Sequence, residues 1–327
     1  MAFTILRHDM RAPAFSKASA PELYAAALDM SAWAEEQGFS MVVLSEHHAV
    51  EDGYLPSPLT LAGCVVGRTR RIRVGIMALL LPLYDPVRLA EDLAVLDLAS
   101  GGRLAVTAGL GYRPEEYAMF GADWKNRGRV MDEYLEVLLR AWRGEEFEWR
   151  GRRVRVTPRP ASQPHPFLAV GGTGRNAARR AARFGLPFQP SVQNEAVFDF
   201  YRSECERLGH TPVLLAPGAG ETLWISDDPD RSWSEIGRYL LHHAMSYASW
   251  QAYRGGSVVD SEATTVDALR AEGKYRVLTP DECVTEARER PGAGLSLFPL
   301  CGGTPPDLGW QSLELFASKV LPRLDAP

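Results

Sequence analysis

The strongest constraint on the fold of this 327-residue chain is the alternation of strand-like and helix-like segments along nearly its whole length. Short runs rich in apolar and β-branched residues are each followed by a longer segment with helical periodicity, and no Pro-, Gly- or Ser-rich linker interrupts the series. About eight such units predict an α/β fold, a (β/α)8 TIM barrel, formed as a single domain over residues 1–327. No Gly-x-Gly-x-x-Gly turn follows the first predicted strand, which disfavours the doubly wound alternative.

The predicted elements are short apolar strands and longer helices. The strands are expected at residues 3–6, 41–44, 72–77, 104–108, 167–170, 187–191, 222–226 and 295–298. The helices are expected at residues 21–37, 58–67, 86–98, 129–142, 176–184, 196–208, 232–247, 280–288 and 313–321. Segment 147–158 alternates around Arg150-Gly151, which predicts a small inserted hairpin. Segment 248–275 fits no unit, so we interpret it as a lid-like excursion after the seventh strand.

Composition excludes several classes of protein. Lys and Arg total 36 against 41 Asp and Glu, and this net charge of −5 provides no electrostatic attraction for nucleic acid or an anionic membrane surface. The longest apolar run, 76–83, is much shorter than the roughly 20 residues that a membrane span needs. The four cysteines form no Cys-x-x-Cys pair and the first residues lack the apolar core of a signal peptide, so we expect a cytoplasmic protein.

A histidine pair follows the second predicted strand, in the sequence Ser45-Glu46-His47-His48. Active sites of barrels lie at the carboxyl ends of the strands, where a histidine beside a carboxylate can act as an acid–base pair. One buried structural histidine beside a solvated one explains the same residues equally well. We expect no metal, because adjacent residues point in different directions and no His-x-x-x-His spacing occurs.

Glycine-rich segments follow two other predicted strands. Residues 170–176, with the sequence VGGTGRN, open directly into a helix, and such a turn presents backbone N–H groups to a phosphate. Residues 109–117 resemble a dinucleotide fingerprint, but Pro114 stands where its third glycine belongs, so that interpretation fails. From the residues alone the apolar run 77–82 is ordinary core, and His242 and His243 are packing or surface residues of an outer helix.

Several motifs occur in a fixed order along the chain: SEHH at 45–48, DPVRLAEDLAVLD at 85–97, SGGR at 100–103, GYRPEEYAMFG at 111–121, and the GGTG turn at 171–174. In these motifs the chain resembles the bacterial luciferase-like monooxygenase family, a group of flavin- and deazaflavin-dependent barrel enzymes. The resemblance extends essentially from end to end. It implies a luciferase-like barrel domain.

The resemblance also implies roles for particular residues. His47 matches the active-site histidine near the reactive edge of the flavin, and Glu46 matches the carboxylate beside it. The bond between Met77 and Ala78 falls where the family has a non-prolyl cis peptide facing the flavin ring. The remaining cofactor-binding residues that the resemblance implies are Tyr112, Gly172, Thr173, Gly174 and Arg175.

Three departures from the family pattern concern the cofactor or the reactive thiol. Leu110 stands where the luciferase α subunit has a phosphate-binding arginine, so Arg113 or Arg175 is expected to replace it. Gly109 occupies the position of the family's reactive thiol. Residues 187–190 (PFQP) replace the Asp-Gly-Trp that many deazaflavin-dependent members carry, which favours FMN over F420.

The function implied is that of a flavin-dependent monooxygenase. It would use O2 and reduced FMN, supplied by a flavin reductase, to oxidise a small organic substrate, and a homodimer is expected. The alternative is an F420-dependent dehydrogenase or reductase that transfers hydride without O2. A third possibility is a non-catalytic flavin-binding paralogue.

Overall fold

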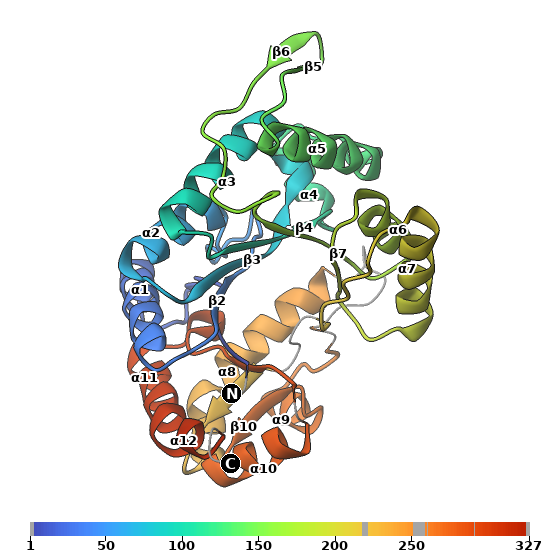
Figure 1. Cartoon of the computed structure of the whole chain (residues 1–327). Helices are drawn as coiled ribbons and strands as arrows, with labels where there is room; N and C mark the ends of the chain where they lie inside the picture. The colour runs from blue at the N-terminus through green and yellow to red at the C-terminus, as the bar shows by residue number, and fades with distance from the viewer. Residues whose placement is uncertain (1–2, 218–221, 251–258, 260, 291, 325–327) are drawn as a thin grey trace. The chain divides into compact units, whose positions relative to one another are not determined.

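A computed structural model describes residues 3–217, 222–250, 259, 261–290 and 292–324 (Figure 1). The described residues divide into two compact units. The first unit comprises residues 3–56 and 222–250 with the described parts of 259–324, and the second comprises residues 57–217. We describe each unit by itself.

The first unit is built on parallel strands in the order β10-β9-β11-β1-β2. Their bounds are β1 Thr4–His8, β2 Met41–Leu44, β9 Thr222–Ile225, β10 Tyr275–Leu278 and β11 Leu295–Leu297. Its helices are α1 Ala20–Glu36, α8 Pro229–Ser249, α9 Val266–Ala271, α10 Pro280–Glu289, α11 Pro306–Leu315 and α12 Leu321–Leu324. All four residues of β2 are buried, as expected of a parallel strand covered on both faces.

The second unit contains parallel strands in the order β3-β4-β7-β8. They are β3 Arg73–Leu80, β4 Leu104–Gly109, β7 Phe167–Gly172 and β8 Phe188–Pro190. Its helices are α2 Pro58–Arg68, α3 Pro86–Ser100, α4 Pro114–Met119, α5 Arg127–Trp142, α6 Arg175–Phe184 and α7 Glu195–Leu208. Strands β5 (Phe147–Trp149) and β6 (Arg152–Val154) form an antiparallel hairpin, which confirms the predicted insertion (Figure 1).

The predicted series of strands and helices is confirmed, with three corrections. Strand β10 was not predicted, because Arg276 interrupts its apolar pattern; in the structure this charge pairs with Glu286 of α10. Helix α4 was not predicted and lies between the strand expected at 104–108 and the helix expected at 129–142. Helix α11 begins at Pro306 rather than at residue 313, and its Gly309 comes so close to Pro299 that an added Cβ would lie 2.8 Å from the Pro299 carbonyl oxygen.

Two expectations are not tested by these elements. Part of the lid-like excursion, residues 251–258 and 260, lies outside the described residues, and α9 belongs to its described part. The single domain over residues 1–327 stays a prediction. No helix within the described part of the chain combines the length and the apolar character that a membrane crossing requires.

An apolar core in the first unit packs α8 against β9, β10 and the end of β11. Its members include Trp224, Trp233, Tyr239, Leu240, Tyr275 and Phe298. Gly302, in the turn after β11, lies directly against α8: an added Cβ would be 2.3 Å from the Tyr239 carbonyl oxygen, and φ is +61°. Only glycine satisfies both the backbone conformation and the close approach at this position.

We therefore expect Gly302→Ala to lower the free energy of unfolding by about 3 kcal/mol or more, from left-handed backbone strain plus a clash with backbone. Gly273→Ala is the matched control, since Gly273 also has a positive φ, +68°, but nothing lies within 4 Å of an added Cβ. It should cost only about 1 kcal/mol. Urea unfolding midpoints and slopes of both variants measure the difference, and equal midpoints would contradict this account.

Candidate functional site

The loops at the carboxyl ends of β1 and β2 are joined by backbone hydrogen bonds in the first unit. The N–H of Leu55 donates to the carbonyl of Asp9 at 2.9 Å, and the N–H of Ala12 donates to that of Asp52 at 2.7 Å. The N–H of His47 donates to the carbonyl of Leu55 at 3.2 Å. The segment that carries the predicted catalytic histidine is thus folded back on itself and held to the β1 loop.

His47 lies in a cluster of aromatic rings formed with Tyr54, Tyr247 and Trp250, which we call the ring cluster. The His47 ring centroid is 4.8 Å from those of Tyr54 and Trp250 and 5.8 Å from that of Tyr247. The side chain is only 5% exposed. The two tyrosine hydroxyls are 2.9 Å apart, and burial first, then the neighbouring Tyr247, raises the pKa of Tyr54 well above its usual value. Tyr54 therefore stays protonated at neutral pH.

A buried ion pair lies beside the ring cluster. Asp52 Oδ2 accepts a hydrogen bond from Arg11 Nε at 2.6 Å and is also 2.6 Å from Arg11 Nη2 and from His242 Nε2. Arg11 Nη2 donates to Ser246 Oγ at 2.6 Å. We call Arg11, Asp52, His242 and Ser246 the clamp. Burial alone would raise the pKa of Asp52, but the hydrogen bond from His242 and the charge and hydrogen bond of Arg11 lower it, so the carboxylate stays ionised.

The clamp was missed by the sequence analysis. His242, predicted as a packing or surface residue, is bonded to Asp52, whereas His243 packs in the interior, with Nδ1 2.6 Å from the Tyr275 hydroxyl. The available signal was positional: Arg11 and Asp52 both follow predicted barrel strands at the carboxyl end, where charged residues are functional candidates.

Glu46 pairs with the second histidine of the motif. Its Oε1 lies 2.8 Å from His48 Nε2, and both residues are buried. The resemblance implied a carboxylate beside His47. In the structure Glu46 is bonded to His48 and His47 lies among aromatic rings, and the catalytic role of Glu46 stays a prediction.

In the second unit, the Met77–Ala78 peptide bond is cis, as the resemblance implied. Gln189 Nε2 lies 3.8 Å from the Met77 sulfur, and the hydroxyl of Thr107 donates to Gln189 Oε1. An added Cβ at Gly109 would lie 2.8 Å from the Cβ of Ala78. The absence of a side chain at Gly109 therefore allows β4 to approach this peptide closely.

The glycine-rich turn after β7 leads into α6, with Gly174 as the N-cap. An added Cβ at Gly171 would meet the Thr107 methyl group at 2.9 Å, and one at Gly172 would meet Ala177 at 2.5 Å. Gly171 and Gly172 therefore pack closely against these neighbours, and the turn is partly exposed directly before the first N–H groups of a 10-residue helix. Such N–H groups can bind an anion, and the phosphate site at this turn stays a prediction.

The two candidate phosphate-binding arginines have different surroundings. Arg175, at the start of α6, is exposed, and its guanidinium stacks 5.3 Å from the Phe200 ring centroid. Arg113 is buried and pairs with Glu116 at 3.3 Å. Arg175 is thus the better candidate. Tyr112 precedes Arg113 in the loop after β4 and is half-buried.

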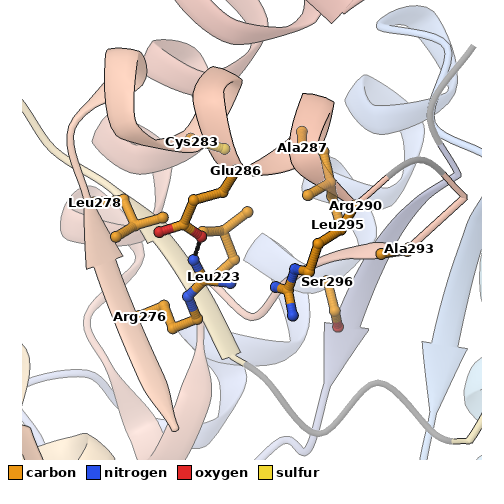
Figure 2. Close-up of a pocket in the computed structure, with 11 residues that line it drawn as sticks. Leu223, Arg276, Leu278, Cys283, Glu286, Ala287, Arg290, Ala293, Leu295 and Ser296 are labelled. Atoms are coloured by element: carbon orange, nitrogen blue, oxygen red, sulfur yellow. Dashed lines mark ion pairs between the residues drawn. The ribbon is translucent and has the colours of Figure 1, made fainter. Parts of the chain in front are cut away.

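A small pocket in the first unit lies between α10 and the starts of β9 and β11 (Figure 2). The ion pair of Arg276 and Glu286 borders it, and the buried hydroxyl of Ser296 has no hydrogen-bond partner among the described residues. Its volume of about 30 Å³ accommodates about two water molecules. The pocket is far too small for a flavin.

Three side chains of metal-binding type meet in the first unit. One ligand atom each of Asp9, His243 and Cys301 lies within 4.8 Å of the others. Both carboxylate oxygens of Asp9 accept backbone hydrogen bonds, from Arg11 and Gly302. Burial raises the pKa of the Cys301 thiol well above its usual value, which keeps it protonated. We assign no metal to this cluster.

Comparison with known proteins shows what the chain is similar to. A family model described as luciferase-like monooxygenase matches residues 7–294. The 4-hydroxyprotoasukamycin monooxygenase of Streptomyces nodosus subsp. asukaensis is 31% identical over 282 residues, 80% of this chain and 68% of that protein. The alkanal monooxygenase alpha chain of Photorhabdus laumondii is 30% identical over 187 residues, 54% of this chain and 52% of that protein. The chain spans about half the length of several curated relatives that it matches.

Solved structures show the same fold over nearly the whole chain. Monooxygenase RslO1 from Streptomyces bottropensis has a TM-score of 0.79 at 27% identity, covering 98% of this chain and 99% of that one. The oxygenating constituent of 3,6-diketocamphane monooxygenase from Pseudomonas putida, solved with FMN, has a TM-score of 0.73 at 21% identity over the full length of both chains. The predicted barrel class is thereby confirmed.

The burial of Asp9 predicts that the free energy of unfolding depends on pH. Burial first, opposed by Arg11, raises the pKa of Asp9 from 3.8 to about 6, so the native state holds a proton that the unfolded chain releases at lower pH. This contribution is present below pH 3.8 and is lost as pH rises through about 6. Relative to Asp9→Asn, the wild-type free energy of unfolding should fall by roughly 3 kcal/mol across that window.

Urea unfolding of both proteins at several pH values measures this difference, with Asp199→Asn, at an exposed site of α7, as a control for the substitution itself. A wild-type advantage that grows with pH would contradict the assignment.

Proposed function

The chain belongs to the luciferase-like monooxygenase family, and we propose from this membership that it is the oxygenase of a two-component flavin monooxygenase. It would use reduced FMN and O2 to oxidise a small organic substrate, with the reduced flavin supplied by a separate reductase. The observation that carries the proposal is the burial of His47 among aromatic rings at the carboxyl end of β2. A relative from Acinetobacter baylyi, 25% identical over 199 residues, is named as the oxygenase component of a trigonelline monooxygenase, which supports a reductase partner.

The second unit contains residues that fit an FMN molecule. At Gly171 and Gly172 any side chain would collide with neighbouring atoms, so the backbone of the turn is bare, and Thr173 and Gly174 lead into the positive end of α6. We assign the FMN phosphate to this turn, with Arg175 as a further donor. Arg175 would serve in place of the phosphate-binding arginine that the luciferase α subunit has at the position of Leu110.

Met77 and Ala78 are proposed to support the flavin ring. Gly109 lets β4 approach Ala78 closely, and Gln189 contacts the Met77 sulfur from β8. Tyr112 is proposed to contact the cofactor from the loop after β4. When bound, reduced FMN supplies the electrons that activate O2, and the protein supplies orientation and exclusion of water.

His47 is proposed to hold or transfer the proton that the reaction requires. Its imidazole is shielded by Tyr54, Tyr247 and Trp250, so water has little access to that proton. Glu46 is proposed as a second acid–base group acting through His48, its partner at 2.8 Å. We propose an apolar or aromatic organic substrate, because aromatic rings surround His47.

Substituting His47 tests the catalytic assignment. We expect His47→Gln to lower substrate-dependent turnover by about 100-fold or more, since a positioned acid–base group contributes roughly that much. FMN affinity should stay within about twofold of wild type, because the residues assigned to the FMN phosphate and to the support of its ring do not include His47. Oxygen uptake and product formation with reduced FMN provide the readout.

His165→Gln is the matched control, since this histidine stacks on Trp142 in the second unit. Turnover by His47→Gln at the wild-type rate would refute the role of His47. Product formation without oxygen uptake would instead identify an F420-type hydride transfer.

The phosphate assignment is tested by two arginines of one helix. Arg175 and Arg179 stack on the same Phe200 ring, at 5.3 and 5.1 Å, but only Arg175 lies at the first turn of α6. Arg175→Ala should weaken FMN binding by about 10-fold, the loss of one charge-assisted contact, and Arg179→Ala by less than about twofold. Fluorescence titration measures both, and equal effects would exclude a specific role for Arg175.

The homodimer also remains a proposal. Val95 and Leu98 are exposed on α3, three residues apart and therefore on one face of the helix, and such apolar pairs suit a subunit interface. Light scattering of the purified protein measures its mass directly.

A further inference from the structure

We propose that Arg11 is a positioning residue: through the clamp it holds the ring cluster in place around His47. The catalytic part of the test rests on the proposed function, whereas the structural part does not.

A single guanidinium connects three separate segments of the first unit. Arg11 belongs to the loop after β1, Asp52 to the loop after β2, and His242 and Ser246 to α8. Two nitrogens of Arg11 make these contacts, Nε to Asp52 and Nη2 to both Asp52 and Ser246. The Arg11 side chain is 1% exposed, so water does not compete for these hydrogen bonds.

Each clamp contact lies close in sequence to a ring of the ring cluster. Tyr54 follows Asp52 by two residues, and the loop between them is held by the hydrogen bond from Ala12 to Asp52. Trp250 follows Ser246 by four residues at the end of α8, a spacing that places both on one side of the helix. Fixing Asp52 and Ser246 therefore restricts where Tyr54 and Trp250 can lie.

The guanidinium also contacts these rings directly. Its Cζ is 5.6 Å from the Tyr54 centroid and 5.9 Å from the Trp250 centroid, within the range of cation–π attraction. The centroids of both rings also lie 4.8 Å from the centroid of the His47 ring. Arg11 is thus one contact removed from His47, which makes it a positioning residue rather than a catalytic one.

Lysine is a poor replacement for this role. The contacts require two donors on one rigid plane, directed at Asp52 and Ser246, together with a flat surface for the rings. A lysine ammonium is a compact charge on a flexible stem and cannot meet both requirements. A positive charge alone therefore does not explain the contacts of Arg11. The variant Arg11→Lys keeps the charge but removes the planar arrangement of donors, so it tests the two contributions separately.

The test combines a spectroscopic signature with kinetics. Histidine is labelled with 15N in the full chain, and the His47 imidazole signals are assigned as those absent from His47→Gln. In Arg11→Lys and Arg11→Ala we expect these signals to shift or broaden. We also expect kcat to fall about 10- to 100-fold, as displacement of a catalytic group by about 1 Å costs up to that factor. FMN affinity should change by less than about threefold, and added guanidinium ion should partly restore Arg11→Ala.

Arg180→Ala is the matched control, since Arg180 is also a buried arginine paired with an aspartate, Asp132, but belongs to the second unit. It should leave the His47 signals unchanged. If the Arg11 variants do not fold, Ser246→Ala removes one hydrogen bond from Nη2 and leaves the ion pair with Asp52 in place. It should still shift the His47 signals, with a smaller loss of kcat.

Folded Arg11 variants, or folded Ser246→Ala, with unchanged His47 signals would overturn the proposal. This outcome is independent of the enzymatic assay. If wild-type protein shows no oxygen-dependent turnover, the proposed function fails, and the signals still decide whether Arg11 positions His47.

Discussion

Parallel strand pairing is the constraint on which both candidate sites depend. In the first unit β1 pairs with β2 and with β11 in parallel, so the segments that follow these strands emerge at one edge. Residues far apart in sequence, such as Asp9, His47 and Cys301, therefore belong to neighbouring loops. The second unit repeats this arrangement with β3, β4, β7 and β8, whose ends carry the cis peptide and the glycine-rich turn.

The two candidate sites differ in whether their charged side chains are buried. Removing an arginine and a carboxylate from water costs several kcal/mol per ion, which close pairing and further hydrogen bonds must offset. Arg11 and Asp52 meet that condition through His242 and Ser246. The proposed phosphate site in the second unit uses bare backbone and an exposed arginine instead. A charged ligand can bind there without first displacing a buried ion pair.

The elements of the fold were predictable to different degrees, for physical reasons. Helices with a proline at the first turn and a glycine at the end, such as α3 with Pro86 and Gly101, were found to within two residues. Strand β10 was not predicted because Arg276 interrupts its apolar pattern. The charge of Arg276 is paired with Glu286 on the next helix, which the local sequence does not reveal. In the same way, the sequence neighbours of Glu46 include two histidines, and only packing directs the carboxylate to His48 and places rings around His47.

The sequence by itself determined the alternation of strands and helices, the glycine-rich turn before α6, and the presence of a histidine at the end of β2, because local periodicity and backbone freedom are properties of neighbouring residues. Its ordered motifs also indicated the family. Only the tertiary structure decided which charges meet. Arg11, Asp52 and His242 are separated by 41 and 190 residues, and a pair at such distances leaves no local pattern. Those long-range contacts require the parallel strands to bring the three segments together.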